Sequence, residues 1–206
     1  MKQPTDPSGP LYVQLMEEVK VRLTSITALT QDQRGIASPL VREFCFLQLR
    51  MLCELIALGC LVANGDILAR SARDLGTKYK PKEMFDAVEK LHPRFYPSPR
   101  TPTRTETGWH FNDYNHHFLS REELVSLWGR CGDILHKGGL KKIINRKPPI
   151  QRSFQDVSSW VLKIQGLLNV HQIEHVGHNS GLIIYMNFGD ENGVVTVHRY
   201  EAITAL

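Results

Sequence analysis

The chain has 206 residues and a mass of 23.5 kDa, with 42% hydrophobic and 22% charged residues. This composition is ordinary for a globular protein with one sizeable core, and it excludes general disorder. The net charge of +4 is modest, so an argument from charge must rest on where the charges cluster. Residues 1–10 are polar and lack the apolar run of a signal peptide, and we therefore expect a flexible tail and a cytoplasmic protein.

The first third of the sequence predicts helices. Apolar residues recur with a period near four over residues 11–29, as on a helix with one buried face. Residues 39–63 are more apolar and predict a central buried helix. Arg50 and Glu54 stand four residues apart there and would pair on one helix face, so a membrane span is a poor alternative. Three cysteines fall on one side of this helix, and we expect them to be reduced core residues: Cys45, Cys53 and Cys60.

The middle of the chain is less regular. A short helix is predicted after residue 66, and another over residues 81–91, which Pro93 closes. Residues 92–118 mix prolines with arginines and aromatic residues, a pattern that cannot propagate a helix and predicts a long crossing loop. Loops of this length are usually functional or mobile.

Helical and strand patterns then follow one another. Ser120 and Glu123 form a capping box, so a helix begins near residue 120, and Gly138 and Gly139 are expected to end it. Residues 154–169 return to helical spacing. The remainder predicts three short strands separated by turn sequences, at residues 172–176, 182–188 and 194–200.

The predicted fold is therefore mainly α. A helical domain spans residues 11–169, with the long loop at 92–118. Residues 170–206 form a three-stranded antiparallel β-meander, which is too small to stand alone and packs on the helices.

The strongest candidate site lies on the helix that begins near residue 120. Arg130 offers a guanidinium, which fits phosphate, and His136 offers an imidazole, the type of side chain that suits proton transfer near neutrality. The segment after Ile134 has no acidic residue up to Gln155. It carries a basic run that is a candidate nucleic-acid-binding segment: Lys137, Lys141, Lys142, Arg146, Lys147 and Arg152.

Helical geometry constrains this pair. At about 100° and 1.5 Å per residue, Arg130 and His136 fall on opposite flanks of the buried stripe, about 9 Å apart along the axis. A joint site needs a bend near Gly132, a frayed helix end, or a second chain across a two-fold interface. A purely structural role for both residues is the alternative: His136 would interact with the last carbonyls of the helix, and Arg130 would pair with Asp133.

An arginine, four to six residues and then a histidine near a helix end, inside an α-helical domain, is similar to the signature of the HEPN superfamily. Five residues, Cys131 to Leu135, intervene here. Many members of that family are metal-independent ribonucleases whose paired copies meet at a dimer interface. The resemblance implies a HEPN-like helical bundle, proton transfer by His136 at an RNA 2′-hydroxyl, and an Arg130 that steadies the phosphate.

The same resemblance implies a homodimer that acts on RNA in a toxin or defence system, with an antitoxin or other protein as partner. One departure matters: active members usually have Asn, Asp or His after the arginine, and Cys131 stands there instead. The alternative is a non-catalytic protein-interaction or RNA-binding module that dimerises through its helices.

No competing chemistry has comparable support. The glycines form no phosphate-binding loop, and no nucleophile elbow is present. The histidines have no carboxylate or cysteine at metal-ligand spacing, so we expect neither metal nor cofactor. Those of the C-terminal strands, among them His171, His175 and His198, are expected to be exposed.

Overall fold

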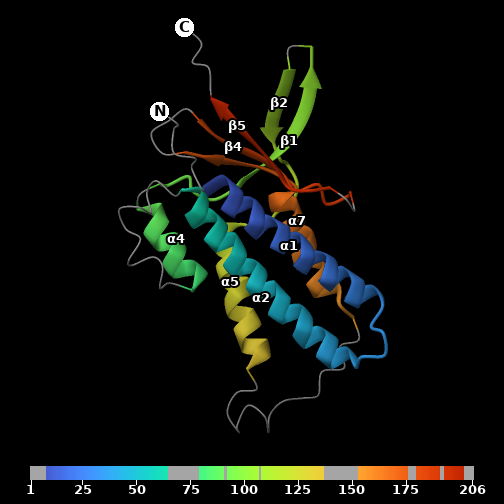
Figure 1. The fold of residues 1–206 in the computed structure, drawn as a ribbon. Coiled ribbons are helices and arrows are strands. Elements are labelled where there is room, and N and C mark those ends of the chain that lie inside the picture. The colour runs from blue at the N-terminus through green and yellow to red at the C-terminus, as the bar shows by residue number, and fades with distance from the viewer. Residues whose placement is uncertain are drawn as a thin grey trace.

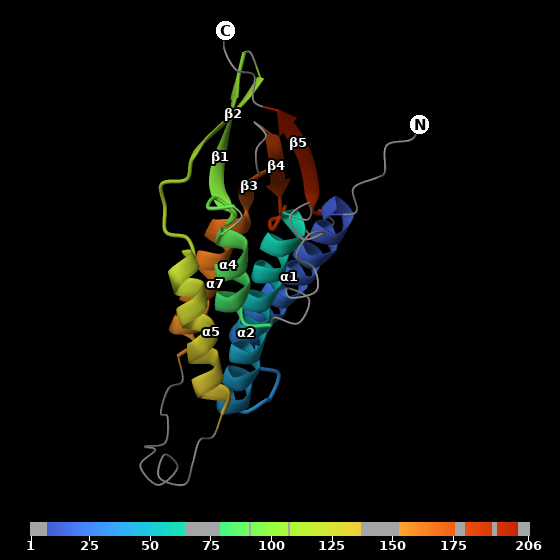
Figure 2. The ribbon, with the colours of Figure 1, turned by 90° about the vertical axis from the view of Figure 1, so that its left-hand side faces the viewer.

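The computed structural model describes residues 8–64, 79–90, 92–106, 108–136, 153–175, 180–190 and 193–201. Within these ranges the chain forms five helices and one curled, five-stranded antiparallel sheet (Figure 1). The helices lie side by side, and the sheet covers one end of them (Figure 2).

The helices agree with the periodicity of the sequence. Helix α2 is central and packs against α1, α4 and α5, while α7 leads directly into the sheet. The short helix predicted after residue 66 lies outside the described residues. The five that are described are α1 (Ser8–Gln31), α2 (Ser38–Ala63), α4 (Pro81–Glu89), α5 (Arg121–Leu135) and α7 (Gln155–Leu168).

Helix α2 provides much of the hydrophobic core. By length and composition it could cross a membrane, but 61% of its most apolar stretch is buried inside the protein. The predicted ion pair is present, with Arg50 Nε 3.3 Å from Glu54 Oε1. The prediction for Cys45, Cys53 and Cys60 is confirmed, because all three are buried and unbridged.

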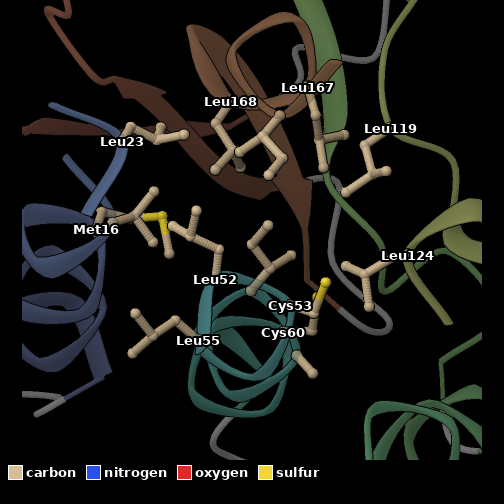
Figure 3. Packing of buried hydrophobic residues seen from close by; sticks show 14 of the residues in the cluster. Met16, Leu23, Leu52, Cys53, Leu55, Cys60, Leu119, Leu124, Leu167 and Leu168 are labelled. Atoms are coloured by element: carbon tan, nitrogen blue, oxygen red, sulfur yellow. The ribbon is translucent and has the colours of Figure 1, made fainter. Parts of the chain in front are cut away.

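The core lies where the helices meet the sheet. Figure 3 shows side chains from α1, α2 and α7 converging with residues at the start of α5. The cluster includes Met16, Leu23, Leu52, Cys53, Leu124, Leu167 and Leu168.

The predicted fold class is wrong, because the sheet has five strands and is not a C-terminal meander of three. The strand order is β2-β1-β3-β4-β5, so a hairpin from the middle of the chain extends the C-terminal strands. The strands are β1 (Ser98–Thr105), β2 (Gly108–Asp113), β3 (Val170–Glu174), β4 (Ser180–Tyr185) and β5 (Thr196–Glu201).

The added hairpin falls within residues 92–118, where the prolines predicted a loop. Strand β1 pairs with β3 only at Ser98 and Pro99, and the rest of β1 pairs with β2 alone. Proline is tolerated where a strand has a neighbour on one side only. Threonines alternate with the prolines and favour extended backbone, and Gly108 supplies a φ of +140° at the turn.

Candidate functional site

Helix α5 fixes the positions of Arg130 and His136. The predicted capping box is confirmed: the Glu123 amide donates to the Ser120 hydroxyl, and the Ser120 amide donates to the Glu123 carboxylate. One face of the helix is buried through Leu124, Leu127 and Cys131. Arg130 therefore lies on a flank of the helix.

Arg130 forms an ion pair with a residue from another helix. Its Nη2 lies 3.5 Å from Oδ2 of Asp156 on α7, and its side chain remains 52% exposed. The sequence-based alternative, a pair with Asp133, is not what the structure shows. A long, half-exposed ion pair holds a guanidinium weakly, so Arg130 can turn toward an anion in solvent.

Asp156 has a second and stronger partner, Arg42 at the start of α2. The two side chains form a two-pronged contact, with Arg42 Nη1 3.0 Å from Oδ1 and Nη2 also bonded to Oδ2. Arg42 is only 14% exposed. Burial raises the pKa of Asp156, but the hydrogen bonds and charge of Arg42 outweigh this and lower the pKa overall. The carboxylate therefore stays ionised, and two cations share one anion.

The surface beside this cluster is hollow. A groove of about 460 Å³ has Ser153, Gln155, Asp156 and Ser159 among its lining residues. These residues belong to the first turns of α7 or directly precede it. These four lining residues are polar, and the start of α7 lies at the end of the helices that is remote from the sheet (Figure 2).

His136 is the residue at which α5 ends. Its backbone leaves the helix with φ −84° and ψ 122°, while its amide donates to the Gly132 carbonyl at 2.9 Å. The side chain is exposed, and no hydrogen bond joins it to Arg130, although both residues are described. The two groups are thus at the same end of the molecule, but one chain does not bring them into contact.

Cys131 occupies the position at which the sequence departs from active HEPN members. It is fully buried between α5 and α2, and burial raises its pKa to about 12, so it is a thiol of the core. Nearby, the Arg50 guanidinium lies 4.4 Å from the centre of the Trp128 ring, and Trp128 Nε1 donates to Glu54. These contacts stabilise the helix pair and offer no nucleophile.

The basic run at Lys137, Lys141, Lys142, Arg146 and Lys147 lies outside the described residues. Sequence reasoning missed Arg42 and Asp156, which are 114 residues apart. No local pattern could have paired them, because their contact depends on how α2 and α7 pack.

The histidines show one clear difference from expectation. Within the described ranges, no group of three or more His, Cys, Asp or Glu residues could hold a metal ion. His198 is exposed, but His171 is completely buried, so the expectation of an exposed strand histidine is wrong for His171. Its side chain points toward the helices. The sequence pattern of so short a strand did not determine which alternate residues of β3 face that way.

Comparison with protein-family models, with curated proteins and with solved structures finds no significant match.

Proposed function

We propose that the chain is an RNA-directed protein, and specifically a metal-independent endoribonuclease whose site resembles that of HEPN proteins. His136 is the proton-transfer group, and Arg130 binds the phosphate. The resemblance concerns the spacing of these two residues within a helix, and it does not extend to the five-stranded sheet.

The observation that carries the proposal is the pairing of Arg42 and Arg130 with a single carboxylate, Asp156. Arg42 satisfies Asp156 with two hydrogen bonds, so the cluster keeps a surplus positive charge. Arg130 is the more exposed of the two arginines and lies beside a polar groove. A phosphate could displace its single long contact at little cost.

The chemistry needs only a base, an acid and a cation. His136 accepts the proton of an RNA 2′-hydroxyl, whose oxygen then attacks the adjacent phosphorus. The bond from phosphorus to the 5′-oxygen breaks, and that oxygen takes a proton from a second imidazolium. The products are a 2′,3′-cyclic phosphate and a 5′-hydroxyl, while Arg130 stabilises the charge on the phosphate oxygens.

A homodimer would complete this site. Within one chain, His136 and Arg130 are about 9 Å apart along the helix and on different flanks. A two-fold arrangement of the helix ends would place His136 of one copy beside Arg130 of the other and would supply the second imidazole. We therefore propose that the active form is a pair of chains.

The test is cleavage of a labelled single-stranded RNA in excess chelator. Wild-type protein is expected to cut the RNA and to leave a matched 2′-O-methyl strand intact. Arg130→Ala and His136→Ala are expected to lower the rate at least 100-fold, with unchanged helical circular dichroism. His110→Ala is the matched control, because His110 is exposed on β2. Unaltered cutting by both site variants would reject the site.

The burial of Cys131 favours the alternative, an RNA-binding module without catalysis. A core thiol follows the arginine, where active HEPN members carry a polar side chain. In that case the same assay would show no cutting by any variant. Filter binding would still detect RNA, with an affinity that falls steeply as salt rises and less steeply in Arg130→Ala.

A further inference from the structure

The sheet has a second face, opposite the one that packs in the core. Alternate residues of each strand lie on the same face of the sheet. On one face, Ile183 of β4 lies between Gln172 of β3 and His198 of β5, and Arg104 of β1 lies opposite Trp109 of β2. The opposite face buries His171 and Ile184 in the core. We call the first the open face, and its functional groups are Trp109, Phe111, Arg104, Tyr185, His198 and Tyr200.

A groove of about 500 Å³ runs along the open face, and its lining is mostly aromatic. The rings of Phe111 and Tyr185 meet edge to face with centroids 6.5 Å apart, and those of Tyr185 and His198 do so at 5.7 Å. Trp109 is 59% exposed at the rim. Large rings held in fixed orientations beside a groove offer flat surfaces for planar ligands.

The charge of this face favours an anion. Arg100 pairs with Asp113, and Glu174 pairs with Arg94, so these charges are balanced. Arg104 is exposed, and it has no ion pair with any residue that the structure describes. The open face therefore combines stacking surfaces with an uncompensated guanidinium.

We propose that the open face binds single-stranded RNA, with unpaired bases stacked on Trp109 and its aromatic neighbours and a backbone phosphate on Arg104. The choice of RNA rests on the proposed function. Bases in a duplex stack on one another and are not free to stack on protein rings, so a single strand is the form that fits. Figure 2 places this sheet at the opposite end of the helices from the C-terminal end of α5, where His136 caps the helix, so it would hold the strand at a second point.

Binding can be measured separately from cleavage by using His136→Ala as the parent protein. The probe is a fluorescent single-stranded RNA, followed by anisotropy in chelator, with an RNA duplex for comparison. Trp109→Ala is the test variant. Tyr79→Ala is its matched control, because Tyr79 is equally exposed but lies outside the sheet. Arg104→Ala is matched by Arg34→Ala, whose guanidinium lies far from the groove beside Asp32.

Trp109→Ala is expected to weaken single-strand binding roughly tenfold, while Tyr79→Ala stays within about twofold. Arg104→Ala should reduce the salt slope by about 0.7, and Arg34→Ala should not. The inference is overturned if the parent fails to bind, if it prefers the duplex, or if the variants and their controls bind alike. If RNA binding depends on Trp109 but the wild-type protein does not cut RNA, the nuclease proposal is rejected and the open-face proposal stands. If the wild-type protein cuts RNA but RNA binding does not depend on Trp109, the open-face proposal is rejected and the nuclease proposal stands.

Discussion

The hydroxyl of Tyr12 lies 2.7 Å from Nε2 of His171, and this contact joins the first helix to the third strand across 159 residues. The other ring nitrogen, Nδ1, is 2.7 Å from the Leu168 carbonyl. A carbonyl only accepts, so Nδ1 carries the proton and Nε2 accepts from Tyr12. Both side chains are buried, and His171 is therefore neutral with both nitrogens satisfied.

The first prediction concerns acid stability. Burial lowers the pKa of His171 from 6.5 to about 4. Below pH 6.5 the unfolded chain binds a proton that the folded protein excludes, so this contribution is complete above pH 6.5 and is lost as pH falls toward 4. The loss reaches about 3 kcal/mol. Urea unfolding at pH 7.5 and 4.5 measures it, and a His171→Gln variant with an equal pH dependence would contradict it.

The second prediction removes the partner. Tyr12→Phe deletes the hydroxyl and leaves Nε2 of His171 buried without a donor. We expect a loss of about 1–3 kcal/mol in the free energy of unfolding at neutral pH. Tyr79→Phe, at an exposed position, should change it by less than about 0.5 kcal/mol. Equal stability of the two variants would show that the buried hydrogen bond contributes nothing.

The third prediction compares two helical glycines. A Cβ at Gly166 would lie 2.7 Å from the backbone carbonyl of His117, so α7 and the loop between β2 and α5 could not both keep their positions. Gly166→Ala should therefore destabilise the protein by about 1–3 kcal/mol, although alanine is the better helix former. Gly129→Ala meets nothing within 4 Å and should stabilise α5 by up to about 1 kcal/mol. Thermal unfolding of both variants measures the difference, and a stabilised Gly166→Ala would contradict the close packing.

The fourth prediction tests the shared carboxylate. Asp156→Asn removes the anion between Arg42 and Arg130, so the partly buried Arg42 loses its charged partner. We expect a stability loss of about 1–3 kcal/mol together with tighter RNA binding and a steeper dependence on salt.

Asp32→Asn provides the control, because the ion pair of Asp32 among the described residues is a 3.9 Å contact with the exposed Arg34. RNA binding should be the same in this control and in the wild type. A weaker affinity in Asp156→Asn would mean that the carboxylate itself contacts the RNA, and the proposed role of the cluster would be wrong.

Local patterns in the sequence predicted local structure well. The capping box at Ser120 and the ion pair of Arg50 with Glu54 connect residues three and four apart, so the amino-acid order alone specifies them. The cysteines of α2 follow from helical periodicity in the same way. These features depend on geometry that is nearly constant from one helix to another.

Features that depend on long-range pairing were not predictable. Strand β1 contains Pro99 and Pro102, so its segment was predicted to be part of a loop, and its partner β2 was included in the same loop. The sequence does not show that most of β1 has a neighbour on one side only. The burial of His171 depends on which face of β3 meets α1, and a strand of five residues leaves that phase open. The contact of Asp156 with Arg42 depends likewise on the packing of α7 against α2.

The most direct test of the nuclease is the rate at which His136→Ala cuts single-stranded RNA in excess chelator, measured with and without added imidazole. If the His136 side chain transfers the proton, the variant is inactive alone, and free imidazole restores part of the wild-type rate. Cutting by His136→Ala at the wild-type rate without imidazole would contradict the proposal.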